Sequence, residues 1–160
     1  FHGDLEAFRQ AATAAGDVLY LADNAGEIVF DRLLIDQLPG RVTVAVRGGA
    51  VLNDATATDA AAAGLGEDVD VVDNGSDAPG TLLADCNESF RRRFDEADLV
   101  IAKGQGNYES LSDVDRDVFF LFKAKCPVIA ACVGLPLGTH AALRSRSPAA
   151  LAGGADHART

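Results

Sequence analysis

The sequence predicts an α/β domain, a three-layer, Rossmann-like open parallel sheet of about five strands with helices on both faces. Two observations predict this architecture. Short apolar runs of strand length alternate along the chain with segments of helical spacing, which is typical of right-handed parallel sheets. Three of the runs also end abruptly in polar residues, as buried strands do where a sheet meets a site. A chain of 160 residues accommodates one such domain with a sizeable core.

The expected elements follow one another in a regular order. Residues 1–16 have the apolar spacing of a helix, with Gly16 as its C-cap. The predicted strands are the apolar and β-branched runs at residues 18–22, 42–46, 69–72, 99–102 and 118–122. Helices are predicted at residues 28–38, 55–63 and 81–95. A further helix is predicted directly after the fourth strand, and another from about residue 123 to 133.

The chain divides into three expected parts. Residues 1–16 are the predicted end of an N-terminal helical region, because the helix begins without a start methionine or a clear cap. Residues 17–143 form the predicted α/β domain. Residues 144–160 contain mostly Ala, Gly, Arg and Ser without an apolar period, so we expect a disordered tail there.

The composition argues against nucleic-acid binding and against a membrane-spanning helix. A formal net charge of −10 would repel a nucleic-acid backbone. No apolar window is long enough for a membrane helix, and the N-terminus lacks the features of a signal peptide, so a cytoplasmic protein is predicted. The three cysteines form no C-x-x-C pair, which predicts reduced and mostly buried thiols. The sequence gives no indication of oligomeric state.

The polar ends of three predicted strands carry the candidate chemistry. If the strands are ordered 3-2-1-4-5, the first and fourth are neighbours whose connections leave in opposite directions, and ligands bind at such a switch point. Asp23 and Asn24, after the first strand, would then share one crevice with Lys103, after the fourth. Asp54, from the loop after the second strand, would complete the crevice.

These residue types suit phosphate chemistry at a metal ion. Oxygens of Asp23, Asn24 and Asp54 are hard donors for a divalent cation, which polarises phosphorus and activates water. Lys103 would neutralise the phosphate, and Gly104 and Gly106 would let backbone N–H groups approach it. Glu27 would orient the water or a sugar hydroxyl.

Each residue also has a purely structural interpretation. Asp23, Asn24 or the pair Asn53-Asp54 can cap a helix, and Glu27 and Asp31 can be first-turn acids that complement a helix dipole. Arg47 is either a substrate contact or a salt-bridging turn residue. The cluster at residues 91–93, three arginines, is interpreted as a solvated helix face or dipole complement rather than an anion site. The histidines are expected to lie far from the strand ends (His2, His140 and His157).

Four segments carry a family resemblance: residues 23–31 (DNAGEIVFD), 46–55 (VRGGAVLNDA), 103–109 (KGQGNYE) and 123–126 (KAKC). In order and spacing they resemble the damage-control phosphatase family, long called domain of unknown function 89, in its small microbial subgroup. The likeness runs from about residue 17 to 137 and matches the family's C-terminal catalytic portion. The subgroup's N-terminal helical region with a C-x-x-C pair is not present, and Gly49-Ala50 stand where a proline is expected.

The resemblance implies a metal-dependent phosphatase that acts on small phosphorylated metabolites, either sugar phosphates or damaged phosphometabolites. The implied cofactor is Mn²⁺, Co²⁺, Ni²⁺ or Mg²⁺. Asp23, Asn24 and Asp54 are similar to the family's metal ligands, and Glu27 and the Lys103-Gly104 turn fall where family members contact substrate and phosphate. The further expected substrate- or phosphate-binding residues are Gly26, Arg47, Asn53, Gly106 and Asn107.

Two rival functions stay open. A haloacid-dehalogenase-like phosphatase would need a second acid two residues after Asp23, where Ala25 stands. A non-catalytic nucleotide- or phosphometabolite-binding α/β module would bind the same ligands without turnover. A methyltransferase has little support, because no S-adenosylmethionine glycine motif follows the first strand.

Overall fold

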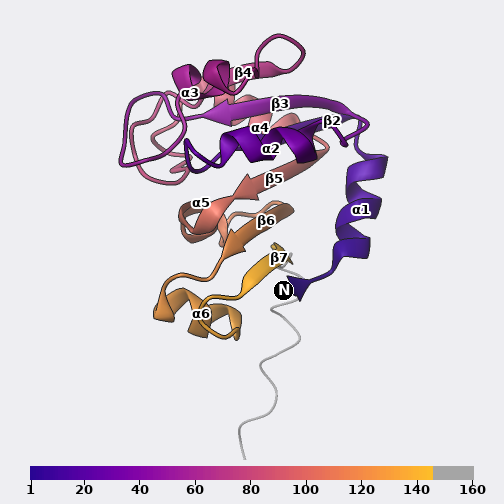
Figure 1. Cartoon of the computed structure of the whole chain (residues 1–160), viewed down its shortest axis with the longest axis vertical. Coiled ribbons are helices and arrows are strands. Elements are labelled where there is room, and N and C mark those ends of the chain that lie inside the picture. Colours follow the sequence, from indigo (N-terminus) through magenta and orange to yellow (C-terminus); the bar gives the residue numbers. More distant parts are fainter. Residues whose placement is uncertain (146–160) are drawn as a thin grey trace, which may run out of the picture.

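In a computed structural model, residues 1–145 are described, and they form one seven-stranded sheet with helices on both faces (Figure 1). The strands are β1 (His2–Gly3), β2 (Asp17–Leu21), β3 (Arg41–Val46), β4 (Asp70–Asp73), β5 (Leu99–Lys103), β6 (Val118–Lys123) and β7 (His140–Arg144). The helices are α1 (Leu5–Ala14), α2 (Ile28–Ile35), α3 (Ala57–Ala62), α4 (Glu88–Glu96), α5 (Gly104–Leu111) and α6 (Pro127–Val133).

The strand order is β1-β7-β6-β5-β2-β3-β4. Strands β4, β3, β2, β5 and β6 pair in parallel, so the predicted order of the five sequence strands is confirmed. The prediction of about five strands was too low, because β7 pairs antiparallel with β6 and β1 adds to β7. Strand β1 has only two residues, and β7 (HAALR) contains no β-branched residue, so neither has the β-branched run of a central strand.

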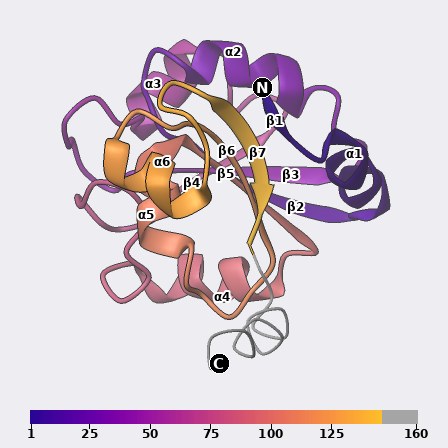
Figure 2. The same ribbon diagram turned by 90° about the horizontal axis from the view of Figure 1, so that it is seen from below.

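Two hydrophobic clusters fill the space on either side of the sheet, and alternate residues of each strand enter different clusters. Val18 and Tyr20 of β2 pack with α1, α2 and α3, whereas Leu19 and Leu21 pack with α4, α5 and α6. Figure 2 shows α2 and α3 on one side of the sheet and α4 on the other. The predicted three-layer arrangement is confirmed.

Several helix boundaries differ from the prediction, and for two of them the structure gives the reason. Helix α4 begins seven residues later than the predicted start at residue 81, because the Asn87 side chain accepts a hydrogen bond from the backbone N–H of Phe90 and caps it there. Helix α1 ends at Ala15 in an extended conformation, so Gly16 does not act as a left-handed C-cap. The Asp98 carboxylate instead accepts hydrogen bonds from the backbone N–H groups of Gly16 and Asp17.

The division of the chain into three parts stays a prediction. The structure describes only the first two residues of the predicted tail. Arg144 closes β7, and the buried Ser145 hydroxyl accepts a hydrogen bond from the backbone N–H of Val118. The remainder of the predicted tail lies outside the described residues. Within residues 1–145, no helix combines the length and the apolar character needed to cross a membrane.

All three cysteines are free, as predicted, but only Cys86 is buried. Burial raises the pKa of the Cys86 thiol to about 11, whereas Cys132 is exposed and Cys126 is intermediate. We expect Cys132 to react quickly with Ellman's reagent at pH 8 and Cys86 to react only when the protein opens. Mass spectrometry of the labelled peptides measures this. Labelling of Cys86 as fast as in urea would contradict the packing of α4 on the sheet.

Candidate functional site

The carboxyl ends of β2, β3 and β5 form one edge of the sheet, and three polar segments meet there. The arrowheads of β3, β5 and β6 point to the same side in Figure 1. The segments after β2 and β3 are joined by backbone hydrogen bonds, from Ala25 N–H to the Asn53 carbonyl at 2.8 Å and from Ala55 N–H to the Asp23 carbonyl at 2.7 Å. Asn24 and Asp54 pair as an isolated antiparallel bridge. The structure therefore brings Asp23, Asn24 and Asp54 together.

Gly104 brings the third segment against Asp23. It is the first residue of α5 and has a φ of +79°, in the left-handed region that favours glycine. A Cβ atom at this position would lie 1.9 Å from Oδ2 of Asp23, so only a glycine lets the backbone approach this carboxylate. The start of α5 and the end of β2 are thus in direct contact.

The site carries an excess of negative charge near Asp23. Burial, together with the nearby charges of Asp54 and Glu27, raises the pKa of the Asp23 carboxyl to about 6, against the opposing effects of Arg47 and Lys125. No hydrogen-bond donor contacts the Asp23 carboxylate within the described residues. A cation at this position would compensate the charge.

Arg47, at the end of β3, lies beneath the site and holds it in place. Its side chain is only 2% exposed, and its Nε donates to Oδ2 of Asp54 at 2.7 Å. The other guanidinium nitrogens donate to the Thr81 hydroxyl at 3.0 Å and to Oδ1 of Asn107 at 3.2 Å. Asn107 is fully buried and donates through Nδ2 to the carbonyls of Ala22 and Lys103. Arg47 and Asn107 therefore connect the ends of β2, β3 and β5.

Lys103 lies between two acids of α2 and its N-terminal turn. Its ammonium group donates to Oδ1 of Asp31 at 2.5 Å and to Oε2 of Glu27 at 3.3 Å. Asp31 is buried, and neither its Oδ2 nor the buried hydroxyl of Tyr20 has a hydrogen-bond partner among the residues that the structure describes. Burial, followed by the charge of Asp31, raises the pKa of Tyr20. An ammonium has three N–H donors, so Lys103 retains one for a ligand.

The donor set fits a hard divalent cation. Oδ2 of Asp54 binds Arg47 and leaves Oδ1 available, and Oδ1 of Asn24 accepts one hydrogen bond, from Gly26 N–H at 2.7 Å. With the free Asp23 carboxylate, these are the oxygen donors that Mg²⁺ and Mn²⁺ prefer. Among residues 1–145, no cluster of three or more His, Cys, Asp or Glu side chains could hold a metal ion. The third side-chain donor of this set would therefore be the Asn24 amide.

A groove of about 720 Å³ adjoins the site and runs between β6, β7 and α1. Glu27, Lys103 and Gly104 line its inner end, and its outer walls are mainly apolar. All three lysines of the chain line it: Lys103, Lys123 and Lys125. His140 also lines the groove, so the expectation that it lies far from the strand ends was wrong. Sequence reasoning missed this because β7 was not predicted.

Two further candidates from the sequence, Asn53 and Gly106, contribute to the site through their backbone or their packing. Asn53 is exposed and contributes its carbonyl to the joined loops, and Gly106 packs in α5 against Gly80. Two residues of the network were not among the sequence candidates for the site, Asp31 and Thr81. Asp31 carried a signal, since it follows Glu27 by one helical turn, whereas Thr81 carried none.

Comparisons with known proteins show which family this chain resembles. The model of the Damage-control phosphatase ARMT1-like domain family matches residues 1–140. A damage-control phosphatase of Pyrococcus horikoshii is 39% identical over 137 residues, covering 82% of this chain and 48% of that protein. A damage-control phosphatase of Archaeoglobus fulgidus is 40% identical over 130 residues, covering 78% and 45%. An uncharacterized protein of Methanocaldococcus jannaschii is 41% identical over 134 residues, covering 79% and 44%.

A solved structure shows the same fold. The crystal structure of a DUF89 family protein (domain of unknown function 89) from Pyrococcus horikoshii superposes with a TM-score of 0.88 at 35% sequence identity. The match covers 91% of this chain and 53% of the other. The chain thus spans about half the length of the relatives that it matches. On its sequence and its fold, the chain belongs to the damage-control phosphatase family.

Proposed function

We propose that this domain hydrolyses phosphate esters of small phosphorylated metabolites, with a divalent metal ion at the carboxyl ends of β2 and β3. The observation that carries the proposal is the convergence of Asp23, Asn24 and Asp54 with Lys103 at one sheet edge. Oxygen donors for a cation lie on one side and an ammonium group for a phosphate on the other. Membership of the damage-control phosphatase family supports the same reaction class.

Asp23, Asn24 and Asp54 would hold Mn²⁺, Co²⁺, Ni²⁺ or Mg²⁺. A bound divalent cation supplies Lewis-acid polarisation of a phosphoryl oxygen and lowers the pKa of water. Arg47 positions Asp54, because its Nε fixes one carboxylate oxygen and leaves the other available. This gives Arg47 a positioning role in the proposal, since its guanidinium is buried and already bonded to Asp54, Thr81 and Asn107.

Lys103 and Glu27 would act on the substrate. The remaining N–H of Lys103 would donate to a phosphate oxygen, and Asp31 and Glu27 keep the ammonium group in place. The Glu27 side chain is 45% exposed, so it can also accept a hydrogen bond from the attacking water or from a sugar hydroxyl. Gly104 lets the backbone at the start of α5 approach the phosphate.

The adjoining groove would take the rest of the metabolite. Its lysines and His140 suit an anionic or hydroxyl-rich group, such as that of a sugar phosphate or a damaged phosphometabolite. A second candidate is a phosphometabolite-binding module without turnover.

Phosphate release tests the proposal. The wild-type protein is assayed with a panel of sugar phosphates and p-nitrophenyl phosphate, in Mn²⁺, Co²⁺, Ni²⁺, Mg²⁺ or EDTA. We expect metal-dependent release that falls by about 100-fold or more in Asp23→Asn, because the variant removes a charged oxygen donor. Asp23→Asn should nevertheless be at least as stable as wild type in EDTA, since it relieves the repulsion from Asp54 and Glu27.

Asp115→Asn is the matched control, because Asp115 is exposed and precedes β6 at the opposite edge of the sheet. It should keep wild-type activity. Release that is unaffected by EDTA or by Asp23→Asn would overturn the metal-dependent proposal. Metal binding without release of phosphate from any substrate would favour the binding module. The same assay on a chain of the relatives' full length would then show whether activity needs residues beyond this domain.

A further inference from the structure

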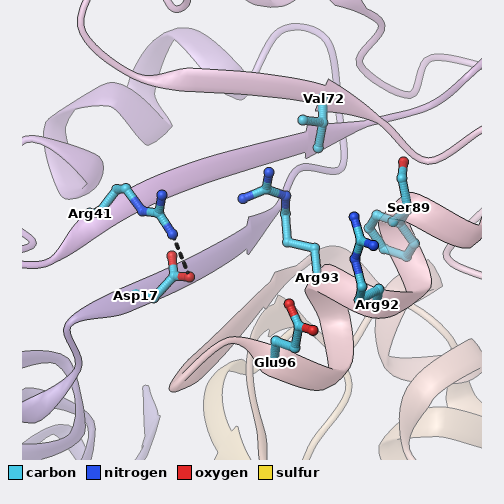
Figure 3. A pocket seen from close by; sticks show the side chains of 8 residues that line it. Asp17, Arg41, Val72, Ser89, Arg92, Arg93 and Glu96 are labelled. Carbon is cyan, nitrogen blue, oxygen red and sulfur yellow. Dashed lines mark hydrogen bonds and ion pairs between the residues drawn. The ribbon is translucent and has the colours of Figure 1, made fainter.

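A second pocket, of about 240 Å³, lies between α4 and the first residues of β2 and β3 (Figure 3). Its charged lining consists of Arg41, Arg92, Arg93, Asp17 and Glu96, and its apolar lining includes Val72 and Phe90. Asp17 and Arg41 are the first residues of their strands, whereas the candidate active site lies where these strands end. The two sites are therefore separate.

The arginines of this pocket are incompletely paired. Arg41 donates to Oδ2 of Asp17 at 2.9 Å. Arg93 donates to the Thr43 hydroxyl at 3.1 Å and, like Arg92, forms no ion pair within the described part of the chain. In Figure 3 the guanidinium groups of Arg41 and Arg93 extend into the same space above Asp17. Like charges in one hollow repel each other unless an anion lies between them.

The concentration of positive charge is unusual for this chain. The protein has 14 basic and 24 acidic residues, yet the lining of this small pocket has three arginines and two acids, Asp17 and Glu96, an excess of positive charge. Thr43 is fully buried, so its bond to Arg93 fixes that guanidinium in a half-buried position before any ligand arrives. A fixed guanidinium loses less conformational entropy when it binds an anion.

We propose that this pocket binds a small phosphate-bearing anion. A guanidinium presents a planar fork of N–H donors that matches two phosphate oxygens, and a phosphate has enough oxygens to meet two forks at once. A monocarboxylate has only two oxygens and would satisfy one fork. A polymer of phosphates is disfavoured because the surrounding protein has a net charge of −10. The ligand class is thus a free phosphate, a pyrophosphate or the terminal phosphate of a metabolite.

An NMR titration of the ¹⁵N-labelled protein with sodium pyrophosphate, in EDTA and low chloride, tests this site independently of any hydrolysis. We expect saturable shifts of the backbone amides of residues 41–43 and 89–96. Inorganic phosphate should give the same pattern with lower affinity, and sodium acetate at the same ionic strength should give none. Arg92→Ala should weaken pyrophosphate binding by about tenfold, as the loss of a charge-assisted hydrogen bond implies.

Matched variants make the outcome decisive. Arg91→Ala removes the same charge from the same helix, but Arg91 does not line the pocket, so its affinity should stay close to that of wild type. Arg93→Lys keeps the charge without the fork and should weaken binding. Four results would each overturn the proposal. The first two are equal pyrophosphate affinity in Arg92→Ala and Arg91→Ala, and shifts confined to residues 23–27 and 103–107. The other two are binding of acetate as tight as that of pyrophosphate, and no shifts at all. Arg92 is exposed, so this test does not depend on whether Arg93 variants fold.

Discussion

Asp54→Ala is expected to lower the free energy of unfolding by about 3–5 kcal/mol, because it leaves the Arg47 guanidinium buried without its counter-charge. The variant also relieves the repulsion between Asp54 and Asp23, which places the loss toward the lower end of this range. Urea unfolding followed by circular dichroism, in EDTA, measures the change. The large penalty arises because the Arg47 side chain is 2% exposed and has no access to water as a substitute partner.

Asp54→Asn separates the structural role of this residue from its chemical role. The amide oxygen still accepts a hydrogen bond from Nε of Arg47, so we expect a clearly smaller loss of stability than in Asp54→Ala. The proposed metal site loses a charged donor in both variants, and phosphate release should fall in both. Equal stability of Asp54→Ala and wild type would show that Arg47 does not depend on this ion pair.

Gly104→Ala is expected to destabilise the protein by about 3 kcal/mol and to remove activity. The left-handed φ of +79° costs an alanine about 1–2 kcal/mol. The new Cβ would also lie 1.9 Å from Oδ2 of Asp23, so either the carboxylate or the start of α5 must move. Thermal unfolding and phosphate release measure the two effects.

Gly138→Ala isolates the cost of the backbone conformation. Gly138 has a φ of +87°, yet nothing lies within 4 Å of a Cβ built there. The loss of stability in Gly138→Ala should therefore be smaller than in Gly104→Ala, because it includes only the cost of the left-handed backbone. Gly106→Ala is a second stability control, because the nearest atoms lie 3.5–4.0 Å away and the residue is helical. Equal destabilisation by Gly104→Ala and Gly138→Ala would contradict the close contact between Asp23 and α5.

The central sheet and the meeting of three strand ends could be predicted from the sequence because both follow from local patterns and general topology. Apolar runs located the five central strands, and the switch-point rule then placed Asp23 and Asn24 beside Lys103. The hydrogen bonds between the Asp23, Asn53 and Asp54 segments add atomic detail to a neighbourhood that the sequence had already indicated.

Other features depend on contacts that no local pattern reports. Arg47 beside two glycines has the local sequence of a surface turn, but its partners Thr81 and Asn107 lie 34 and 60 residues further along the chain. Asp31 was recognised as a helix acid, and its ion pair with Lys103 spans 72 residues. Strand β7 escaped prediction because its sequence, HAALR, contains no β-branched residue, and His140 was misplaced with it.

The most direct test of the proposed metal-phosphate site is a calorimetric titration of the chain with Mn²⁺. This measurement does not require turnover, so it applies to a domain that spans about half the length of its relatives. The proposal predicts that wild type and Asp115→Asn bind Mn²⁺ alike, whereas Asp23→Asn and Asp54→Asn bind it at least about tenfold more weakly. Unchanged Mn²⁺ affinity in both site variants, or no binding by wild type, would contradict the assignment of Asp23 and Asp54 as metal ligands.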